Sequence, residues 1–278
     1  MNDLFGKKKT LIGMVHLLPL PGAPLFQNNF SQTIDRAVGE AKILEKAGFT
    51  AVLVENYGDV PFAKEAVDEQ TFQAMDEVLK KVRAEVKLPI GVNVLRNDSL
   101  SAMKLAHQNG CQFIRVNVLS GGMLTDQGVI EGKAYELLRL RKQLSSKVLI
   151  LADVLVKHAI PLGKIDVSAV ARDTAYRSLA DALIVTGAET GKEAGLERLL
   201  AVKKAVPDRP LLVGSGININ NIHKYLAIAD GAIVGTGLKI DNQTTSPISL
   251  EKARGLVEVL RNQGIKEPRN QGIKESKK

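Results

Sequence analysis

The sequence predicts an α/β protein whose eight strands and eight helices close into a (β/α)8 barrel. Three observations support this fold. Short apolar runs alternate with helical patterns along the chain, each run ends in a polar residue or glycine, and the last two runs end in glycine-rich loops. Runs that are apolar on both faces indicate parallel strands, because helices cover both faces of such a sheet. Eight βα units in about 250 residues match the size of this barrel.

Each expected strand is followed by a stretch with helical spacing. The first helix is expected to begin at Ser31, whose hydroxyl can cap it, and to end at Gly48. Another helix begins at Asp98 or Ser99, and the last begins at Ser249. The expected strands lie within TLIGMVHL (10–17), TAVLVEN (50–56), PIGVNVL (89–95), FIRVNVL (113–119), VLILADV (148–154), ALIVTG (182–187), PLLVGSG (210–216) and GAIVGTG (231–237).

A doubly wound open sheet is the alternative arrangement of these elements. That fold requires a glycine-rich phosphate loop after its first strand. The residues at this place, HLLPLPG (16–22), contain two prolines and a single glycine and do not form such a loop. The sequence therefore favours the closed barrel.

The composition excludes several classes of protein. Trp is absent and aromatic residues make up 4% of the chain, which argues against a stacking platform for single-stranded nucleic acid. The single cysteine, Cys111, cannot form an internal disulfide and is expected to be unreactive. The four histidines lack the spacing of zinc ligands. We therefore expect no metal, no cofactor and no nucleic-acid partner.

Positive charge is concentrated at the two ends of the chain. The formal net charge is +8, of which residues 1–9 supply +2 and residues 261–278 supply +4. We expect a basic N-terminal segment (1–9), a barrel (10–262) and a basic, disordered tail (263–278) that carries most of a tandem duplication, RNQGIKEP and RNQGIKES. Both ends should leave the barrel opposite its mouth, where they either dock on an anionic membrane or only improve solubility.

The expected location is the cytoplasm, or the face of a membrane. The N-terminus lacks the apolar stretch of a signal peptide. The longest apolar region, LIGMVHLLPLPGAPL, is interrupted by a histidine and three prolines, so it is not expected to span a bilayer.

Polar residues and glycines end the eight strands at one common position. Aligned by their last apolar pair, the strands end in MVH, LVE, GVN, RVN, LAD, IVT, LVG and IVG. Because side chains alternate along a strand, the third positions are expected to face the lumen at the barrel mouth, where the active sites of barrels lie. These positions are His16, Glu55, Asn93, Asn117, Asp153, Thr186, Gly214 and Gly235.

Arg115 is the single charge expected one layer deeper in the lumen. Gly91 on the preceding strand is expected to leave room for its side chain, and Glu55 and Asp153 are expected to pair with it. Buried ion pairs of this kind can be purely structural. Six polar groups from six consecutive strands favour a functional pocket instead.

If the pocket is catalytic, geometry assigns roles to its residues. Asp153 or Glu55 is the candidate general base, and Arg115 holds the other carboxylate ionised or orients the substrate. His16 is a second acid–base candidate. Hydrogen bonds to substrate hydroxyls or to a developing oxyanion are assigned to two amides, Asn93 and Asn117.

The loops after the last two strands are expected to bind phosphate. They read GSG (214–216) and GTG (235–237), and ININ (217–220) is expected to open a helix. Barrels often hold phosphate here on backbone N–H groups and a helix N-terminus, although glycines also form tight βα turns. The prediction is thus a TIM barrel of the phosphate-binding type, with the ligands Gly214, Ser215, Gly216, Gly235, Thr236 and Gly237.

Two further loops are expected near the mouth. Residues 186–195, TGAETGKEAG, are either a lid that carries Glu189 or Lys192, or a solvated loop. The loop after the fifth strand, VKHAIPLG, brings Lys157 and His158 to the mouth. Lys157 there can neutralise a phosphate or face solvent.

Several stretches together resemble one known family. They are GMVHLLPLPGAP, VLVENYGDVPF, IGVNVLRND, FIRVNVLSGGMLTDQGVIEG, ADVLVKHA, VTGAETG and VGSGIN. They match in order segments of the BtpA family, also called the BtpA/SgcQ family, over roughly residues 8–262. The details RVNVLSG, TDQGVIEG and ADVLVKHA are most similar to its cyanobacterial branch.

The resemblance implies a phosphate-binding TIM barrel and two classes of function. For cyanobacterial members it implies a role in the accumulation of the photosystem I reaction-centre core. The protein would then act at the cytoplasmic face of the thylakoid membrane, with photosystem I assembly components as partners. SgcQ-like members are associated with sugar metabolism, which implies an enzyme with a small phosphorylated ligand of the sugar or nucleoside type. The two functions are compatible, and both stay open, as does a homo-oligomer.

Overall fold

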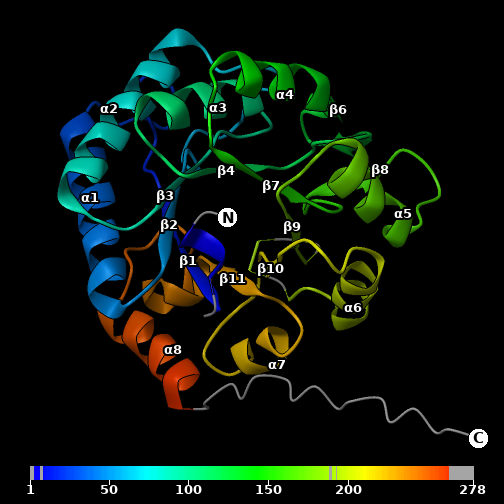
Figure 1. The fold of residues 1–278 in the computed structure, drawn as a ribbon. Helices are drawn as coiled ribbons and strands as arrows, with labels where there is room; N and C mark the ends of the chain where they lie inside the picture. The colour runs from blue at the N-terminus through cyan, green and yellow to red at the C-terminus, as the bar shows by residue number, and fades with distance from the viewer. Residues whose placement is uncertain (1–2, 7–8, 188–189, 192, 263–278) are drawn as a thin grey trace, which may run out of the picture.

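The computed structural model describes residues 3–6, 9–187, 190–191 and 193–262. Eight parallel strands close into a barrel in the order β1-β11-β10-β9-β7-β4-β3-β2, and the helices surround it (Figure 1). The predicted (β/α)8 barrel is confirmed, and the closed order excludes the open sheet. The barrel strands are β1 (Thr10–His16), β2 (Ala51–Glu55), β3 (Ile90–Asn93), β4 (Phe113–Val116), β7 (Leu149–Asp153), β9 (Ala182–Val185), β10 (Leu211–Val213) and β11 (Gly231–Val234).

The helices follow the strands in alternation, with two changes from the expected ends. The first helix is capped by Asn29, whose side chain accepts a hydrogen bond from Gln32 N at 3.1 Å, and not by Ser31. It ends as predicted at Gly48, which has φ +98°. Residues 217–220 precede the seventh helix but do not form it. The helices are α1 (Phe30–Ala47), α2 (Glu69–Glu85), α3 (Ser99–Gln108), α4 (Ala134–Gln143), α5 (Val167–Arg172), α6 (Leu196–Ala205), α7 (Ile222–Leu226) and α8 (Leu250–Asn262).

The polar strand ends face the lumen, but the register does not place them in one flat ring. His16 lies beside Glu55, and Glu55 beside Asn93. The pairing of β3 with β4 then sets Arg115, and not Asn117, level with Asn93. The same two-residue step recurs between β7 and β9, β10 and β11, and β11 and β1. Four such steps give the eight-residue stagger of a TIM barrel, and even steps keep every strand end facing inward.

The lumen below the mouth is filled by apolar side chains. Gly91 does not make room for Arg115, because a Cβ there would lie 2.0 Å from Phe113 Cε2, so the Phe113 ring fills this space. Leu4, in the short helix η1 (Asp3–Phe5) that lies over the barrel axis in Figure 1, packs into the same core. A larger core lies between the strands and the surrounding helices. The inner core includes Ile12, Met14, Leu53, Leu151, Ile184, Leu212 and Ile233.

A small antiparallel sheet at the barrel mouth was not expected from the sequence. It consists of β5 (Gly122–Thr125) and β6 (Gly128–Glu131), which follow β4, and β8 (Ala159–Pro161), which follows β7. Strands of three or four residues carry too little alternation to be detected. The sheet ties two loops together and thereby fixes the chain on both sides of Lys157, because β7 precedes this residue and β8 follows it.

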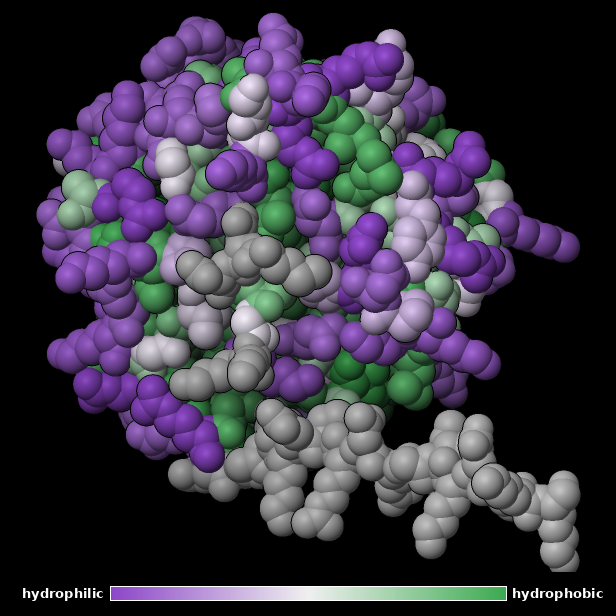
Figure 2. All heavy atoms as spheres, viewed as in Figure 1, coloured by the Kyte–Doolittle hydropathy of each residue, from purple (hydrophilic) through white to green (hydrophobic). Residues whose placement is uncertain are grey.

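The expected membrane docking of the chain ends stays a prediction. The tail, 263–278, lies outside the described residues, as do residues 1–2 and 7–8 of the N-terminal segment. Lys9 is described, and its Nζ donates to the carbonyl of Ala229 at 2.8 Å. None of the described helices is long and apolar enough to cross a membrane. Figure 2 shows hydrophilic side chains over most of the face seen in Figure 1.

A buried ion pair holds α1 against the segment that follows β11. Lys239 Nζ donates to both carboxylate oxygens of Glu40 at 2.8 Å, and the two side chains are 0% and 3% exposed. The backbone N–H of Ile248 donates to the same carboxylate at 3.2 Å. Glu40 thus stabilises the segment that carries one wall of the mouth.

Replacing Lys239 with Met should lower the free energy of unfolding by about 3 kcal/mol, because Glu40 would stay buried with Arg36 Nε, 3.3 Å from one of its oxygens, as its remaining ion-pair partner. Urea denaturation measures the loss. The control is Lys42→Met, which removes a lysine paired with Glu85 at the surface and should hardly move the midpoint. Equal losses in the two variants would contradict the role assigned to burial.

Candidate functional site

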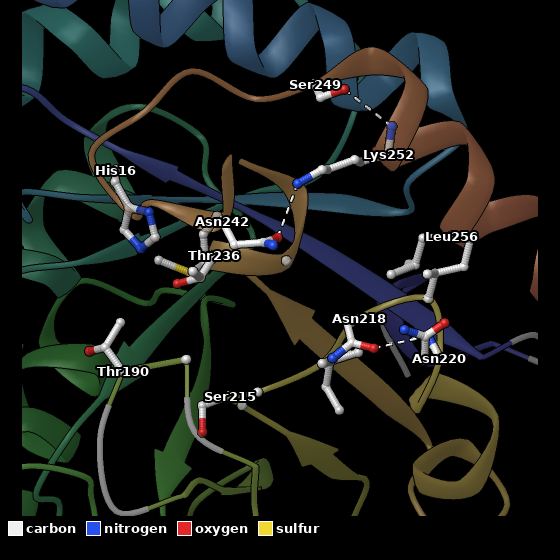
Figure 3. A pocket seen from close by; sticks show the side chains of 18 of the residues that line it. His16, Thr190, Ser215, Asn218, Asn220, Thr236, Asn242, Ser249, Lys252 and Leu256 are labelled. Carbon is white, nitrogen blue, oxygen red and sulfur yellow. Dashed lines mark hydrogen bonds between the residues drawn. The ribbon is translucent and has the colours of Figure 1, made fainter. Parts of the chain in front are cut away.

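The mouth of the barrel contains a cavity of about 670 Å³. Its wall is formed by the ends of β1, β2 and β4, by the loops after β7, β9, β10 and β11, and by the first turns of α8 (Figure 3). The cavity brings together both groups of residues predicted from the sequence. These are His16, Glu55 and Arg115 from the polar strand ends, and Gly214, Ser215, Gly216, Gly235, Thr236 and Gly237 from the glycine loops.

Glu55 is the buried carboxylate in the cavity wall, and two neighbours hold it. Asn93 Nδ2 donates to Glu55 Oε2 at 2.5 Å, and His16 Nε2 lies 3.7 Å from Glu55 Oε1. Burial, followed by the positive charge of Lys239, lowers the pKa of His16 well below its usual range. His16 is therefore a neutral imidazole at neutral pH, and its lowered pKa makes it a weaker base than an exposed histidine.

Arg115 and Asp153 form an ion pair inside the lumen. Arg115 Nη2 lies 3.0 and 3.2 Å from the two oxygens of Asp153, and Asn117 Nδ2 donates to the same carboxylate at 2.9 Å. Burial opposes the charge of Arg115, but the carboxylates of Asp153 and Glu55 outweigh it and raise the pKa of Arg115. Asp153 is thus occupied by Arg115 and is absent from the cavity wall. The geometry favours Glu55 over Asp153 as the base.

Several buried polar atoms at the strand ends have no hydrogen-bond partner among the described residues. Leaving a buried polar group unpaired costs about 1–3 kcal/mol, and such groups are uncommon in folded proteins. Their concentration at one end of the barrel favours a bound ligand as their partner. The atoms are His16 Nδ1, Arg115 Nε, Asn117 Oδ1 and Thr186 Oγ1.

The glycines of the two loops are required by the packing of the barrel itself. A Cβ on Gly214 would lie 2.5 Å from Ile184 Cγ2, and one on Gly237 would lie 2.3 Å from the carbonyl oxygen of Ile217. Gly216 has φ +71°, in the region that favours glycine. Close packing therefore explains these glycines without a phosphate, and the two motifs alone do not identify a phosphate site.

The two hydroxyl groups predicted to bind phosphate lie in the cavity wall and already have partners. Ser215 Oγ accepts a hydrogen bond from Gly187 N at 2.7 Å, and Thr236 Oγ1 lies 2.9 Å from Thr244 Oγ1. A hydroxyl has one proton to donate and two lone pairs, so Thr236 keeps further hydrogen-bonding capacity.

The positive group near the glycine loops is a lysine and not the expected helix N-terminus. Asn218 N, within the ININ segment (217–220), is already paired with Asn221 Oδ1 at 2.9 Å. Lys252, in the first turn of α8, lies in the cavity wall and donates to Asn242 Oδ1 at 3.0 Å (Figure 3). The sequence signal for Lys252 was its position three residues after the expected cap of the last helix.

A second cavity of about 410 Å³ adjoins the first. Glu55, Lys157 and Thr190 line both cavities and mark their junction. The mouth therefore offers two compartments on either side of Glu55, one bordered by the glycine loops and one with a more apolar wall. The second wall includes Tyr57, Val60, Phe62, Leu95, Arg96, Asn117 and Asp126.

Lys157 has a more specific position than the sequence suggested. It follows the end of β7 by four residues, and Arg96 Nη2 donates to its carbonyl oxygen at 2.6 Å. Burial lowers the pKa of Lys157 to about 8, aided by the positive charge of Arg115 and opposed by Glu55 and Asp153. The only sequence signal was its place in a loop directly after a strand end.

The expected lid is described only in part. Thr190 and Gly191 line the first cavity, and Thr190 N donates to His158 Nε2 at 3.0 Å, which connects the loops after β7 and β9. Glu189 and Lys192, predicted to act from this lid, lie outside the described residues. The closing motion stays a prediction.

Cys111 lies far from the mouth, in a separate cavity that Leu4 also lines. Burial raises the pKa of the Cys111 thiol to about 12, so the thiol stays protonated and is a poor nucleophile. Within the described ranges, no three His, Cys, Asp or Glu side chains are grouped so that they could hold a metal ion.

Replacing Asp153 with Leu should lower the free energy of unfolding by about 3–5 kcal/mol, because Arg115 would stay buried without its hydrogen-bonded carboxylate. The double variant Arg115→Met with Asp153→Leu should recover most of that loss, because apolar side chains can fill the same lumen. Urea denaturation of the single and double variants tests the pair. A double variant less stable than Asp153→Leu alone would contradict this account.

Residues 7–262 match the model of the BtpA family. An uncharacterized protein of Methanocaldococcus jannaschii is 50% identical, over 90% of this chain and 95% of the relative. The photosystem I biogenesis protein BtpA of Synechocystis sp. is 43% identical, over 95% of this chain and 93% of the relative. SgcQ, a protein of the sgc region of Escherichia coli, is 31% identical, over 87% of this chain and 90% of the relative.

Solved structures resemble the chain in fold alone. A structure described as native KDPGal superposes with a TM-score of 0.57 at 17% identity, over 92% of this chain and 97% of the other. Phosphoribosyl anthranilate isomerase from Thermus thermophilus superposes with a TM-score of 0.55 at 12% identity, over 91% of this chain and 99% of the other. Together with the sequence relatives, the family match confirms the resemblance noted from the sequence: this chain belongs to the BtpA family.

Proposed function

We propose that this protein is an enzyme that acts on a small phosphorylated substrate, such as a sugar phosphate or a nucleoside phosphate. One observation carries the proposal. A single cavity of about 670 Å³ joins the glycine loops after β10 and β11 to the buried polar cluster of His16, Glu55 and Arg115. Cavities of this size hold small metabolites, and barrels carry out chemistry at the ends of their strands.

The phosphate is assigned to the space between loops 214–216 and 235–237. The first N–H groups of the 3-10 turn η3 (Thr236–Leu238) have no acceptor within that turn. Lys252 adds a positive charge and an ammonium donor in the same wall. An anion at this place would therefore meet backbone and side-chain donors together.

The chemistry is assigned to the junction of the two cavities. Glu55 is the general base, because it lines both cavities and Asn93 fixes one of its oxygens. The neutral His16 beside it can form a hydrogen bond with the substrate. Arg115, oriented by Asp153, stabilises negative charge that develops on the substrate. Asn93 and Asp153 are positioning residues in this assignment.

Inorganic phosphate, glycerol 3-phosphate and ribose 5-phosphate should raise the melting temperature, whereas unphosphorylated ribose should not. A ligand at about 100 times its dissociation constant adds roughly 2.7 kcal/mol of stability. Lys252→Gln should reduce the shift, because it removes the positive charge from the cavity wall. Differential scanning fluorimetry measures both effects.

The matched control is Lys104→Gln, which removes an equal charge from an exposed position on α3. This variant should keep the full shift, which would separate a local effect of Lys252 from an effect of net charge. Equal shifts with ribose and ribose 5-phosphate, or equal losses in the two variants, would rule out the assigned phosphate site.

The second candidate function is biogenesis of photosystem I. Identity of 43% to the Synechocystis protein of that name, over most of both chains, favours it. The 50% identity to an archaeal relative argues against a role confined to photosynthesis. A barrel that binds a metabolite in all these relatives and serves assembly in one lineage is compatible with both observations.

If the chain shares the cyanobacterial role, its expression should restore photosystem I in a Synechocystis strain that lacks the related protein. The measurement is the amount of photo-oxidisable photosystem I reaction centre per cell. The strain complemented with its own protein is the positive control. No recovery from this chain at an equal protein level would remove photosystem I biogenesis as its function.

A further inference from the structure

The side chain of Lys157 lies where the two cavities of the mouth meet. Among the described residues, it is the lysine that lines both cavities, together with Glu55. Lys252, the other lysine in the first cavity, lies beside the glycine loops. A ligand in the first cavity can therefore contact both the glycine loops and Lys157.

The loop that carries Lys157 is held from two sides. Arg96 is buried, and its Nη2 donates to the Lys157 carbonyl oxygen at 2.6 Å. Directly after Lys157 and His158, strand β8 pairs with β5 through the partners Thr125 and Ala159. A side chain that starts from a fixed backbone position is suited to precise chemistry, because little conformational freedom is lost when it reacts.

Burial favours the neutral form of the amine, whereas the charges around it oppose one another. Arg115 on β4 and Arg96 in the loop after β3 are both positive, whereas Glu55 and Asp153 provide the opposing negative charges. Burial is the largest influence, and the resulting pKa is about 8. Roughly a quarter of such a lysine is unprotonated at pH 7.5, compared with about one in a thousand for an exposed lysine.

These features suit a nucleophile better than a binding site for phosphate. A lysine that only neutralises phosphate works best when it is fully protonated, and Lys252 and Arg115 already supply positive charge to the same cavity. No hydrogen bond from the Lys157 ammonium to another described residue is found. The amine is therefore not occupied by a structural role in the part of the chain that the structure describes.

We propose that Lys157 forms a Schiff base with the carbonyl carbon of a phosphorylated aldehyde or ketone. The inference rests on the proposed function and narrows its substrate class to carbonyl compounds. The lone pair of Lys157 Nζ forms the C–N bond, and the C=O π electrons move to oxygen. One proton passes from nitrogen to this oxygen and a second comes from solvent, so that water leaves and a protonated imine remains.

Glu55 is placed to relay these protons, because it lines the same junction. The protonated imine withdraws electrons from the neighbouring carbon, which promotes removal of a proton or cleavage of a carbon–carbon bond there. No oxidant, reductant or metal is needed for the step.

Borohydride reduction in the presence of dihydroxyacetone phosphate or glyceraldehyde 3-phosphate tests the proposal. The imine is reduced to a stable secondary amine, which intact-mass and peptide mass spectrometry detect. We expect at least about tenfold more adduct at Lys157 than at the exposed Lys164 of the same loop. Unphosphorylated dihydroxyacetone should label Lys157 less, because it lacks the phosphate contact.

Two variants distinguish the effect of the Lys157 amine from the effects of its positive charge and of changes elsewhere in its loop. Lys157→Arg keeps a positive charge but has no reactive amine, so it should lose the adduct. Lys164→Arg, a change in the same loop outside both cavities, should keep it. Adduct spread over exposed lysines, with no preference for Lys157, would overturn the proposal.

The borohydride experiment is combined with the measurement of the melting temperature in the presence of inorganic phosphate, so that the Schiff base and the phosphate site are tested separately. Stabilisation by inorganic phosphate without an adduct at Lys157 would overturn the Schiff base and leave the proposed enzyme on phosphorylated substrates intact. An adduct at Lys157 without stabilisation by phosphate would support the imine and remove the phosphate site. Absence of both would overturn both.

Discussion

The buried charge of Arg115 is the constraint on which the rest of the barrel mouth depends. A guanidinium in a barrel lumen is tolerated only when carboxylates compensate it, and Asp153 commits both of its oxygens to this task. Asn117 completes the coordination of that carboxylate. Glu55, held by Asn93, is then the carboxylate left facing the cavity. The different roles of the two carboxylates follow from which of them the arginine occupies.

The sequence was enough to predict that the side chains at the strand ends point into the lumen. It was not enough to predict the level of each side chain along the barrel axis. Direction follows from alternation within one strand, and the even steps of the register leave it unchanged. Height depends on the stagger that closes the sheet, which is a property of all eight strands together. A flat alignment therefore puts Arg115 one layer too deep. It also assigns the space at Gly91 to Arg115, when the ring of Phe113 fills it.

The loop residues of the site carry no periodic signal, so the sequence could not rank them. Lys252 belongs to a helix that surrounds the barrel, and polar residues on such a helix usually face solvent. The first turn of this helix reaches the cavity only because the barrel closes. Lys157 and Arg96 lie in loops, and their importance follows from the contact between them. The glycine loops show the opposite case, because their pattern is clear in the sequence, yet packing against Ile184 explains Gly214.

The ion pair that the fold must accommodate also shapes the chemistry of the mouth. Apolar side chains would fill the lumen at least as well as Arg115 and Asp153, so stability alone gives no reason for a buried pair. The positive charge of Arg115 does act on Lys157, where it adds to the effect of burial and favours the neutral amine. Glu55 lines the same junction and is a carboxylate that can accept protons. The strand FIRV (113–116) thus carries its arginine to a level of the barrel where its buried charge pairs with Asp153 and also acts on the Lys157 amine.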